Sequence, residues 1–202
     1  MINKEQKEKL ENKRYQLQLK LNVAERWKKL EAAWNDYFVK FTDHNIPFRI
    51  VYAECVQQED LPYWKEVVQH KNSSIPFDID HFILSDHYPI HEKAYKIFGD
   101  TNPVRYVPDL PVKAQYEEDA NKIIAEAIAE LDLTDDTIYY FLSRFPIALE
   151  INLSTVQQFA AQIFDMPIGE DIILVSKDFN WMIFRSLENE WRYGLKRKAP
   201  AL

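Results

Sequence analysis

The stretch TIYYFLSRFPIALEINLSTVQQFAAQIF, residues 137–164, decides the fold because its hydrophobic pattern changes period along its length. Residues 137–144 are rich in aromatic and β-branched side chains, which predicts a strand. A proline-containing turn leads to a second predicted strand over residues 147–154. Apolar residues then recur at helical spacing over residues 155–164, which predicts a helix.

Three further apolar runs follow this helix, and each has the length of a strand. They are DIILVS (171–176), NWMIFRS (180–186) and EWRYGL (190–195). Short strands joined by tight turns form antiparallel sheets. The predicted unit is therefore β-β-α-β-β-β, a mostly antiparallel sheet with a helix packed on one face. This arrangement belongs to the α+β class.

The N-terminal region predicts a long helix, because residues 3–42 lack proline and glycine and are rich in helix-forming residues. Apolar residues are sparse before Val23 and frequent after it. We therefore expect the first half of this helix to project or pack weakly, and the second half to dock. Any break in the helix is expected near Asn22.

Shorter elements are expected between this helix and the sheet unit. They are strands at 48–56 and 77–84, and helices at 63–70, 91–99 and 112–133. The connection at residues 101–111 carries three prolines and marks the best candidate boundary. This divides the chain into a helix-rich region with one or two strands (1–110) and an α+β unit (111–202), although one continuous domain stays open.

Charge is distributed unevenly along the chain. The net charge is −7, but residues 1–30 carry nine Lys/Arg against four Glu, and residues 185–202 carry five against two. Residues 31–184 therefore hold a net −15. This acidic part of the chain argues against a broad surface that binds nucleic acid. It suits a cationic protein partner, because long-range attraction would speed the encounter between the two proteins. The alternative is that the negative charge only keeps an ordinary cytoplasmic protein soluble.

Several function classes are excluded by composition. The three glycines lie far apart, so neither a Rossmann fingerprint nor a P-loop is present, and no cofactor is expected. A single cysteine, Cys55, excludes an internal disulfide framework. The charged N-terminus does not read as a secretory signal, and no apolar run is long enough to span a membrane. We expect a cytoplasmic protein.

The stretch DIDHFILSDHYPIHE, residues 78–92, holds three of the five histidines and is the candidate metal site. The possible ligands are Asp80, His81, Asp86, His87 and His91. His87 and His91 are four residues apart, a spacing that would place both on one helix face. This pattern makes a metal-dependent hydrolase the first alternative function.

Three observations favour a polar connection over a metal site. Pro89 lies between His87 and His91 and disfavours a continuous helix there. In a strand over 77–84, Asp80 and His81 would point to opposite faces. Asp86 also suits a helix cap. We therefore expect no metal ligands and no catalytic residues, since Cys55 has no neighbouring cation and no serine stands in a nucleophile motif.

Residues 135–194 resemble small α+β immunity proteins of bacterial polymorphic and contact-dependent toxin systems. The likeness lies in the order of features: a Tyr-rich strand, a proline turn, a strand entering a helix that ends near Phe164-Asp165, then NWMIFRS and EWRYG. The resemblance implies a non-enzymatic protein that binds and neutralises one cognate toxin, and such proteins are commonly acidic where the toxin is a basic nuclease. It transfers no specific binding residue.

The leading hypothesis is thus an acidic binding protein whose partner is a basic toxin domain, with neither nucleic acid nor membrane as a partner. A structural or adaptor protein that associates through helix 3–42 is the second alternative, beside the metal-dependent hydrolase.

Overall fold

The computed structural model describes residues 4–70, 75–85, 87–102, 104–134, 137–145, 147–165 and 170–197. Its helices are α1 (Lys4–Tyr37), α2 (Val39–Asp43), α3 (Leu61–His70), α4 (Pro89–Phe98), α5 (Ala120–Leu131), α6 (Leu153–Gln158) and α7 (Ala160–Phe164), with 3₁₀ turns η1 (Gln58–Asp60) and η2 (Ile79–His81). Its strands are β1 (Arg49–Ala53), β2 (Val112–Ala114), β3 (Thr137–Leu142), β4 (Ile147–Asn152), β5 (Ile172–Ser176), β6 (Trp181–Arg185) and β7 (Trp191–Leu195).

The strands form a seven-stranded sheet in the order β1-β4-β3-β5-β6-β7-β2, and the neighbouring strands pair antiparallel. The predicted α+β class and the β-β-α-β-β-β order of the C-terminal part are confirmed. The N-terminal region supplies the edge strand β1, which pairs with β4. The sheet therefore takes strands from both sides of residue 110.

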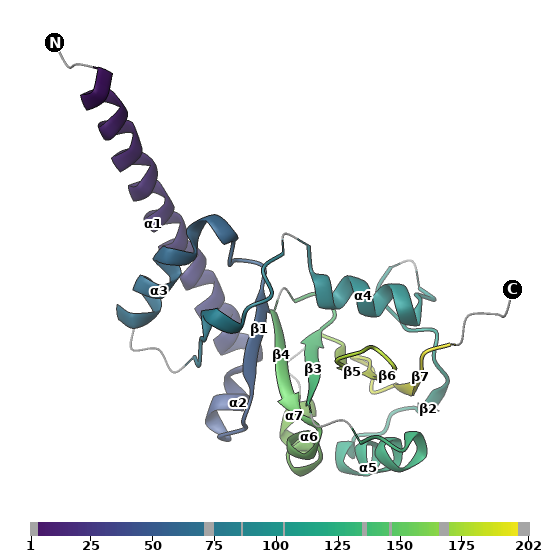
Figure 1. The fold of residues 1–202 in the computed structure, drawn as a ribbon. Coiled ribbons are helices and arrows are strands. Elements are labelled where there is room, and N and C mark those ends of the chain that lie inside the picture. The colour runs from purple at the N-terminus through teal and green to yellow at the C-terminus, as the bar shows by residue number, and fades with distance from the viewer. Residues whose placement is uncertain are drawn as a thin grey trace, which may run out of the picture.

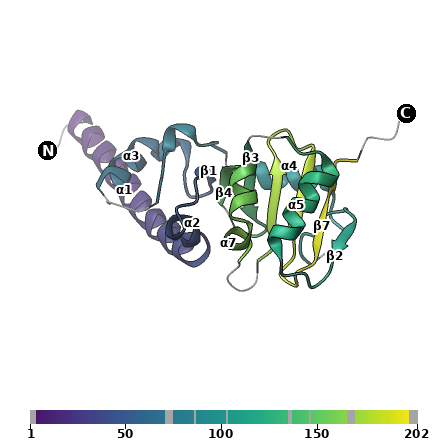
Figure 2. The same ribbon diagram turned by 90° about the horizontal axis from the view of Figure 1, so that it is seen from below.

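Helices cover both faces of this sheet, as Figure 1 shows. One face packs against the second half of α1 and against α2, α5, α6 and α7, and the other packs against α4 and the following connection. Figure 2 shows α5 and α7 in front of the strands. The central strands are apolar at consecutive positions because alternate side chains enter different cores: Ile172 and Leu174 enter one, Ile173 and Val175 the other.

Two predicted elements are wrong. Residues 77–84 do not form a strand; they contain η2, where the Asp78 carboxylate accepts a hydrogen bond from the Asp80 backbone N–H at 3.2 Å. Such local side-chain bonds compete with strand formation. The helix expected from residue 112 begins only at Ala120, after the Asp119 carboxylate accepts from Lys122 N. Residues 112–114 instead form β2 against β7.

The predicted helix over 3–42 is nearly right, but its break is displaced. α1 runs through Asn22, whose side chain accepts a hydrogen bond from Gln18 one turn earlier, and the helix is interrupted only at Phe38. Likewise, the helix expected over 155–164 is split at Phe159 into α6 and α7. Among the shorter helices, α4 ends at Gly99 as expected, since φ there is +69°.

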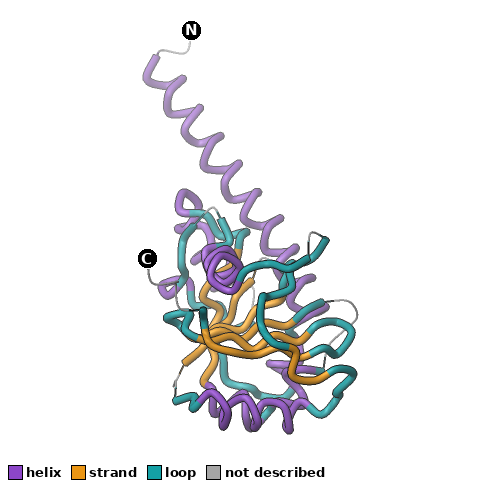
Figure 3. Tube along the Cα trace, turned by 90° about the vertical axis from the view of Figure 1, so that its right-hand side faces the viewer, coloured by secondary structure: helices purple, strands orange, loops and turns teal. Residues whose placement is uncertain are grey.

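The two halves of α1 differ as expected from their apolar content. Every residue from Lys4 to Gln18 is exposed, and this half extends away from the body (Figure 3). The second half docks through one face of large side chains. These are Leu19, Val23, Trp27, Leu30 and Trp34.

A buried ion pair fixes the docked half of α1. Asp60 is fully buried, and its carboxylate receives hydrogen bonds from Arg26 of α1, from Trp64 Nε1 at 3.1 Å and from Gln57 N at 3.3 Å. The full set of donors offsets the cost of removing this charge from water. The pair therefore fixes where α1 crosses η1 and α3.

We expect Asp60→Ala to destabilise the fold by about 3–5 kcal/mol, because it leaves the Arg26 charge half-buried without its partner. Urea unfolding measures this. Asp80→Ala is the matched control, since Asp80 pairs with Lys65 in an exposed position, and it should leave the unfolding midpoint almost unchanged. Equal midpoints for the two variants would contradict the anchoring role of Asp60.

Candidate functional site

The candidate metal ligands are spread over several environments. Asp80 pairs with Lys65 at 2.5 Å, and His81 Nδ1 lies 2.5 Å from an Asp78 carboxylate oxygen, so the aspartates and His81 do not point apart as the strand prediction required. The hydrogen bond from His81 lowers the pKa of Asp78. His87 is exposed before α4, whereas His91 is buried within it.

No group of three His, Cys, Asp or Glu side chains is placed to hold a metal ion in the part of the chain that the structure describes. Asp86 lies outside those residues. Pro89 is the first residue of α4, so His87 precedes the helix and the helical spacing between the two histidines does not arise. The two histidines therefore have different surroundings: His87 is exposed to solvent, and His91 is buried in the core.

His91 and Tyr95 bind the turn between β3 and β4. His91 Nε2 lies 2.8 Å from the carbonyl oxygen of Phe145. The Tyr95 hydroxyl donates a hydrogen bond to the backbone carbonyl oxygen of Ser143 at 2.5 Å. Burial lowers the pKa of His91 to about 4, so the imidazole is neutral at neutral pH. These two side chains satisfy backbone carbonyls and hold α4 on the sheet.

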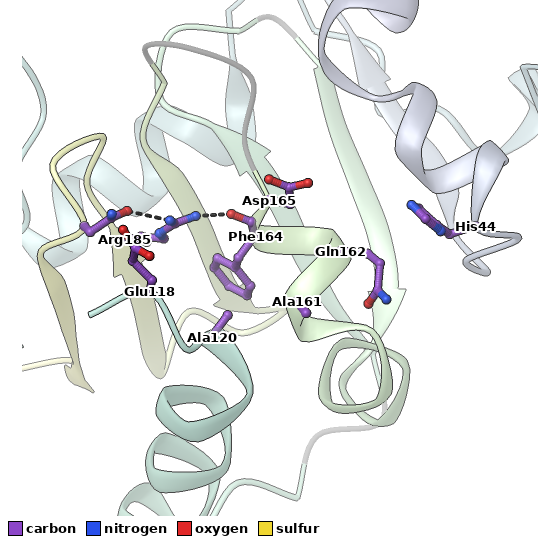
Figure 4. A pocket seen from close by; sticks show the side chains of 9 residues that line it. His44, Glu118, Ala120, Ala161, Gln162, Phe164, Asp165 and Arg185 are labelled. Carbon is purple, nitrogen blue, oxygen red and sulfur yellow. Dashed lines mark hydrogen bonds between the residues drawn. The ribbon is translucent and has the colours of Figure 1, made fainter. Parts of the chain in front are cut away.

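A pocket of about 510 Å³ opens at the C-terminal end of α7, beside the start of α5 and the end of β6 (Figure 4). Its polar lining comes from four separate parts of the chain. The residues are His44, Glu118, Gln162, Asp165, Arg185 and Asn189. Sequence reasoning did not find this pocket, because these residues converge only in the folded chain.

Two cations close the end of α7 beside this pocket. Arg185 donates to the Phe164 carbonyl and to Asn189 Oδ1, and its guanidinium lies 5.5 Å from the Trp191 ring centroid (Figure 4). Lys40 donates to the carbonyls of Ile163 at 2.6 Å and Asp165 at 2.9 Å. Both cations therefore satisfy helix-end carbonyls, the position that the helix dipole favours for positive charge.

Burial opposes the charge on both of these groups. It lowers the pKa of Lys40 to about 7 and also lowers the pKa of Arg185, while the carboxylates of Asp165 and Glu118 act in the opposite direction on Arg185. The exposed side chains that line the pocket include the carboxylates Glu118 and Asp165 and the imidazole of His44.

The carboxylates continue along α5. The exposed acids Glu118, Asp119, Glu126, Glu130 and Asp132, here called the acidic α5 surface, surround the outer side of this helix. Two nearby lysines offset part of the charge: Lys113 pairs with Glu130, and Lys122 pairs with Glu117 at 2.8 Å. Buried residues such as Ile123 and Ile124 hold the opposite side of α5 on the sheet.

An exposed aromatic residue stands at the start of this surface. Tyr116 is 82% exposed and has a φ of +58°, a left-handed conformation that is uncommon for a bulky side chain. It also borders a second pocket of about 210 Å³ with Arg105, Glu188 and Glu190. No sequence signal marked Tyr116, because its exposure depends on the turn between β2 and α5.

Cys55 lies in the turn after β1 and not within the strand expected over residues 48–56. Burial raises the pKa of its thiol to about 12. Among the described residues, no helix is both long enough and apolar enough to cross a membrane.

The low pKa of His91 predicts a pH-dependent stability. The unfolded chain protonates this imidazole near pH 6.5, and the folded chain only near pH 4. The contribution of His91 to the free energy of unfolding should therefore be fully present above pH 6.5. It should fall by up to about 3 kcal/mol as the pH is lowered toward 4. His91→Gln should flatten this dependence in urea unfolding series, and His87→Gln, at an exposed position, should not. Parallel pH curves for wild type and His91→Gln would contradict this assignment.

The scattered Asp and His side chains predict that Zn²⁺ or Mn²⁺ leaves the melting temperature of the protein unchanged. A thermal shift series with each metal, with native mass spectrometry in parallel, measures this. A stoichiometric metal adduct lost in His87→Gln would restore the metal-site interpretation.

Comparison with known proteins gives no relative from which a function could be transferred. No protein-family model matches the chain. No curated protein and no solved structure matches it either. A functional conclusion must therefore come from the chain's own residues and their arrangement.

Proposed function

We propose that this protein is a non-enzymatic binding protein that neutralises a basic bacterial toxin domain through an acidic surface. The resemblance of residues 135–194 to toxin-immunity proteins supports the class of partner. The charge distribution supports the sign of the partner's surface, since residues 31–184 carry a net −15.

The observation that carries the proposal is the concentration of acids around α5. Residues 117–134 contain six acidic residues and one lysine, and five of the six acids are exposed. α5 is held on the sheet by a buried apolar face, so these carboxylates sit on a rigid support. A rigid, like-charged surface needs little reorganisation when an oppositely charged partner binds.

Tyr116 and the two pockets give this surface shape as well as charge. Both pockets are lined by residues of the connection between β6 and β7, with Glu118 at one and Tyr116 at the other. Exposed tyrosines are frequent energetic anchors in protein interfaces, and their rings accept lysine or arginine side chains. We place the centre of the interface at Tyr116 and Glu118, with the other residues of the acidic α5 surface as its flank.

In this proposal the protein acts by steric cover. Negative potential draws the basic partner in and orients it, and the exposed tyrosine and the pockets then hold cationic side chains that the toxin needs for its own anionic substrate. Catalytic groups are not required of the neutraliser.

The test is binding to a basic toxin domain encoded beside this protein's own gene. We expect co-purification at low salt that weakens at high salt, because screening removes the charge attraction. Glu118→Lys/Glu126→Lys should weaken binding by about tenfold or more and abolish protection of cells that express the toxin. Tyr116→Ala should weaken binding without changing its salt dependence.

The matched control is Glu59→Lys/Glu92→Lys, which changes the net charge equally at exposed sites away from α5. It should keep the affinity within a small factor. Equal losses in both double variants would mean that net charge alone, and not the acidic α5 surface, determines binding. Retained protection by Glu118→Lys/Glu126→Lys would refute the proposed surface.

A further inference from the structure

The first half of α1 carries an exposed stripe of three leucines. Leu10, Leu17 and Leu21 are 43%, 59% and 53% exposed. Their spacings of seven and four residues place them within roughly 40° of one another on the helix, at about 100° per residue. The residues that dock α1 on the body lie on average roughly 140° away, so the stripe faces outward.

A projecting helix of this kind is unusual on energetic grounds. Helices of about 12–15 residues without packing are marginal in water, and Lys4–Gln18 form a segment of that length with every residue exposed. Burying the leucine stripe would stabilise this half of α1 through the hydrophobic effect. The face is therefore suited to a second helix.

We propose that the partner is a second copy of this chain, bound as a two-fold, antiparallel helix pair. In this register Leu10 of one copy opposes Leu21 of the other, and Leu17 lies against the aliphatic stem of Arg14. The overlap covers residues 4–27 of each copy, about 36 Å of helix at 1.5 Å per residue. This self-association is independent of the toxin-neutralising role.

Charge selects the antiparallel direction. The stripe side of α1 also carries three cations, Lys7, Arg14 and Lys28. In a parallel pair each of them would face the same residue of the second copy, so like charges would meet. The antiparallel register places Lys7 over Ala24 of the second copy and brings Lys4 near its Glu25. Lysine and arginine stems can cover apolar surface while their charged ends stay in water.

The same register matches the net charges of the two halves. Residues 4–14 carry five cations against three acids, so the free tip is basic. The facing segment, residues 17–27, contains one acid, Glu25, and two cations that already have carboxylate partners: Lys20 pairs with Glu66, and Arg26 pairs with Asp60. The basic residues 4–14 thus meet a segment whose remaining charge is the Glu25 carboxylate, whereas a parallel pair would place one basic segment on another.

The bodies leave room for this pairing. In the overlapped part of the docked half, Leu21 and Glu25 on the stripe side are exposed, and so is Lys28 just beyond it. The first half of α1 extends away from the body (Figures 1 and 3). An antiparallel pair would therefore place the two bodies at opposite ends.

Light scattering coupled to size-exclusion chromatography tests the proposal on the full chain. The wild type should have twice the 24.1 kDa chain mass at high protein concentration. Leu10→Gln/Leu17→Gln/Leu21→Gln should run as a monomer with an unchanged body, since all three side chains are exposed. Tyr15→Gln is the matched control, because Tyr15 is 56% exposed on another side of α1, and it should remain dimeric.

Engineered disulfides test the direction of the pair. Leu10→Cys/Leu21→Cys should form a covalent dimer under oxidation. Leu10→Cys alone should not, because the two introduced thiols would lie about 16 Å apart along the pair, beyond the roughly 7 Å limit between disulfide Cα atoms. The native Cys55 thiol gives little background, since burial raises its pKa to about 12.

Three results would overturn the proposal. A wild type that is monomeric at every concentration would exclude a second copy as the partner. This holds even if the leucine stripe binds a different protein. A dimer that survives the triple leucine substitution would place the contact elsewhere. Efficient crosslinking of Leu10→Cys alone would exclude the antiparallel register.

Discussion

The rest of the structure depends on the burial of the central strands on both faces at once. β3, β5 and β6 present apolar side chains at successive positions, so neither face can be left to water without a large hydrophobic cost. One face requires α1, α2 and α5 to α7; the other requires α4. This constraint explains why a chain with a simple antiparallel sheet recruits helices from both of its halves.

Polar groups that enter these layers are matched mainly to backbone carbonyls. Lys40 and Arg185 bind the end of α7, and His91 and Tyr95 bind the turn between β3 and β4. Their shifted pKa values therefore have a structural cause, namely burial beside a fixed acceptor.

An acidic surface and a basic surface lie at separate places on the molecule. The acidic α5 surface lies on the outer side of α5, while residues 4–14 of α1 are basic and carry part of the leucine stripe. A toxin bound at the first surface and a second copy bound at the other would not compete for the same residues. The scaffold could then present two acidic α5 surfaces in one assembly.

The sequence by itself determined the α+β class, most strand positions and the contrast between the halves of α1, because these follow from local hydrophobic period and density. Tertiary structure alone decided the edge strand β2, the pairing of β1 with β4, and the sites. β2 has only three residues and exists through its pairing with β7, and Asp78 approaches His81 only because η2 replaces a strand. The pocket at α7 joins Glu118, Asp165 and Arg185, which lie far apart in the chain. Local pattern specifies which element forms, whereas long-range packing specifies which side chains meet.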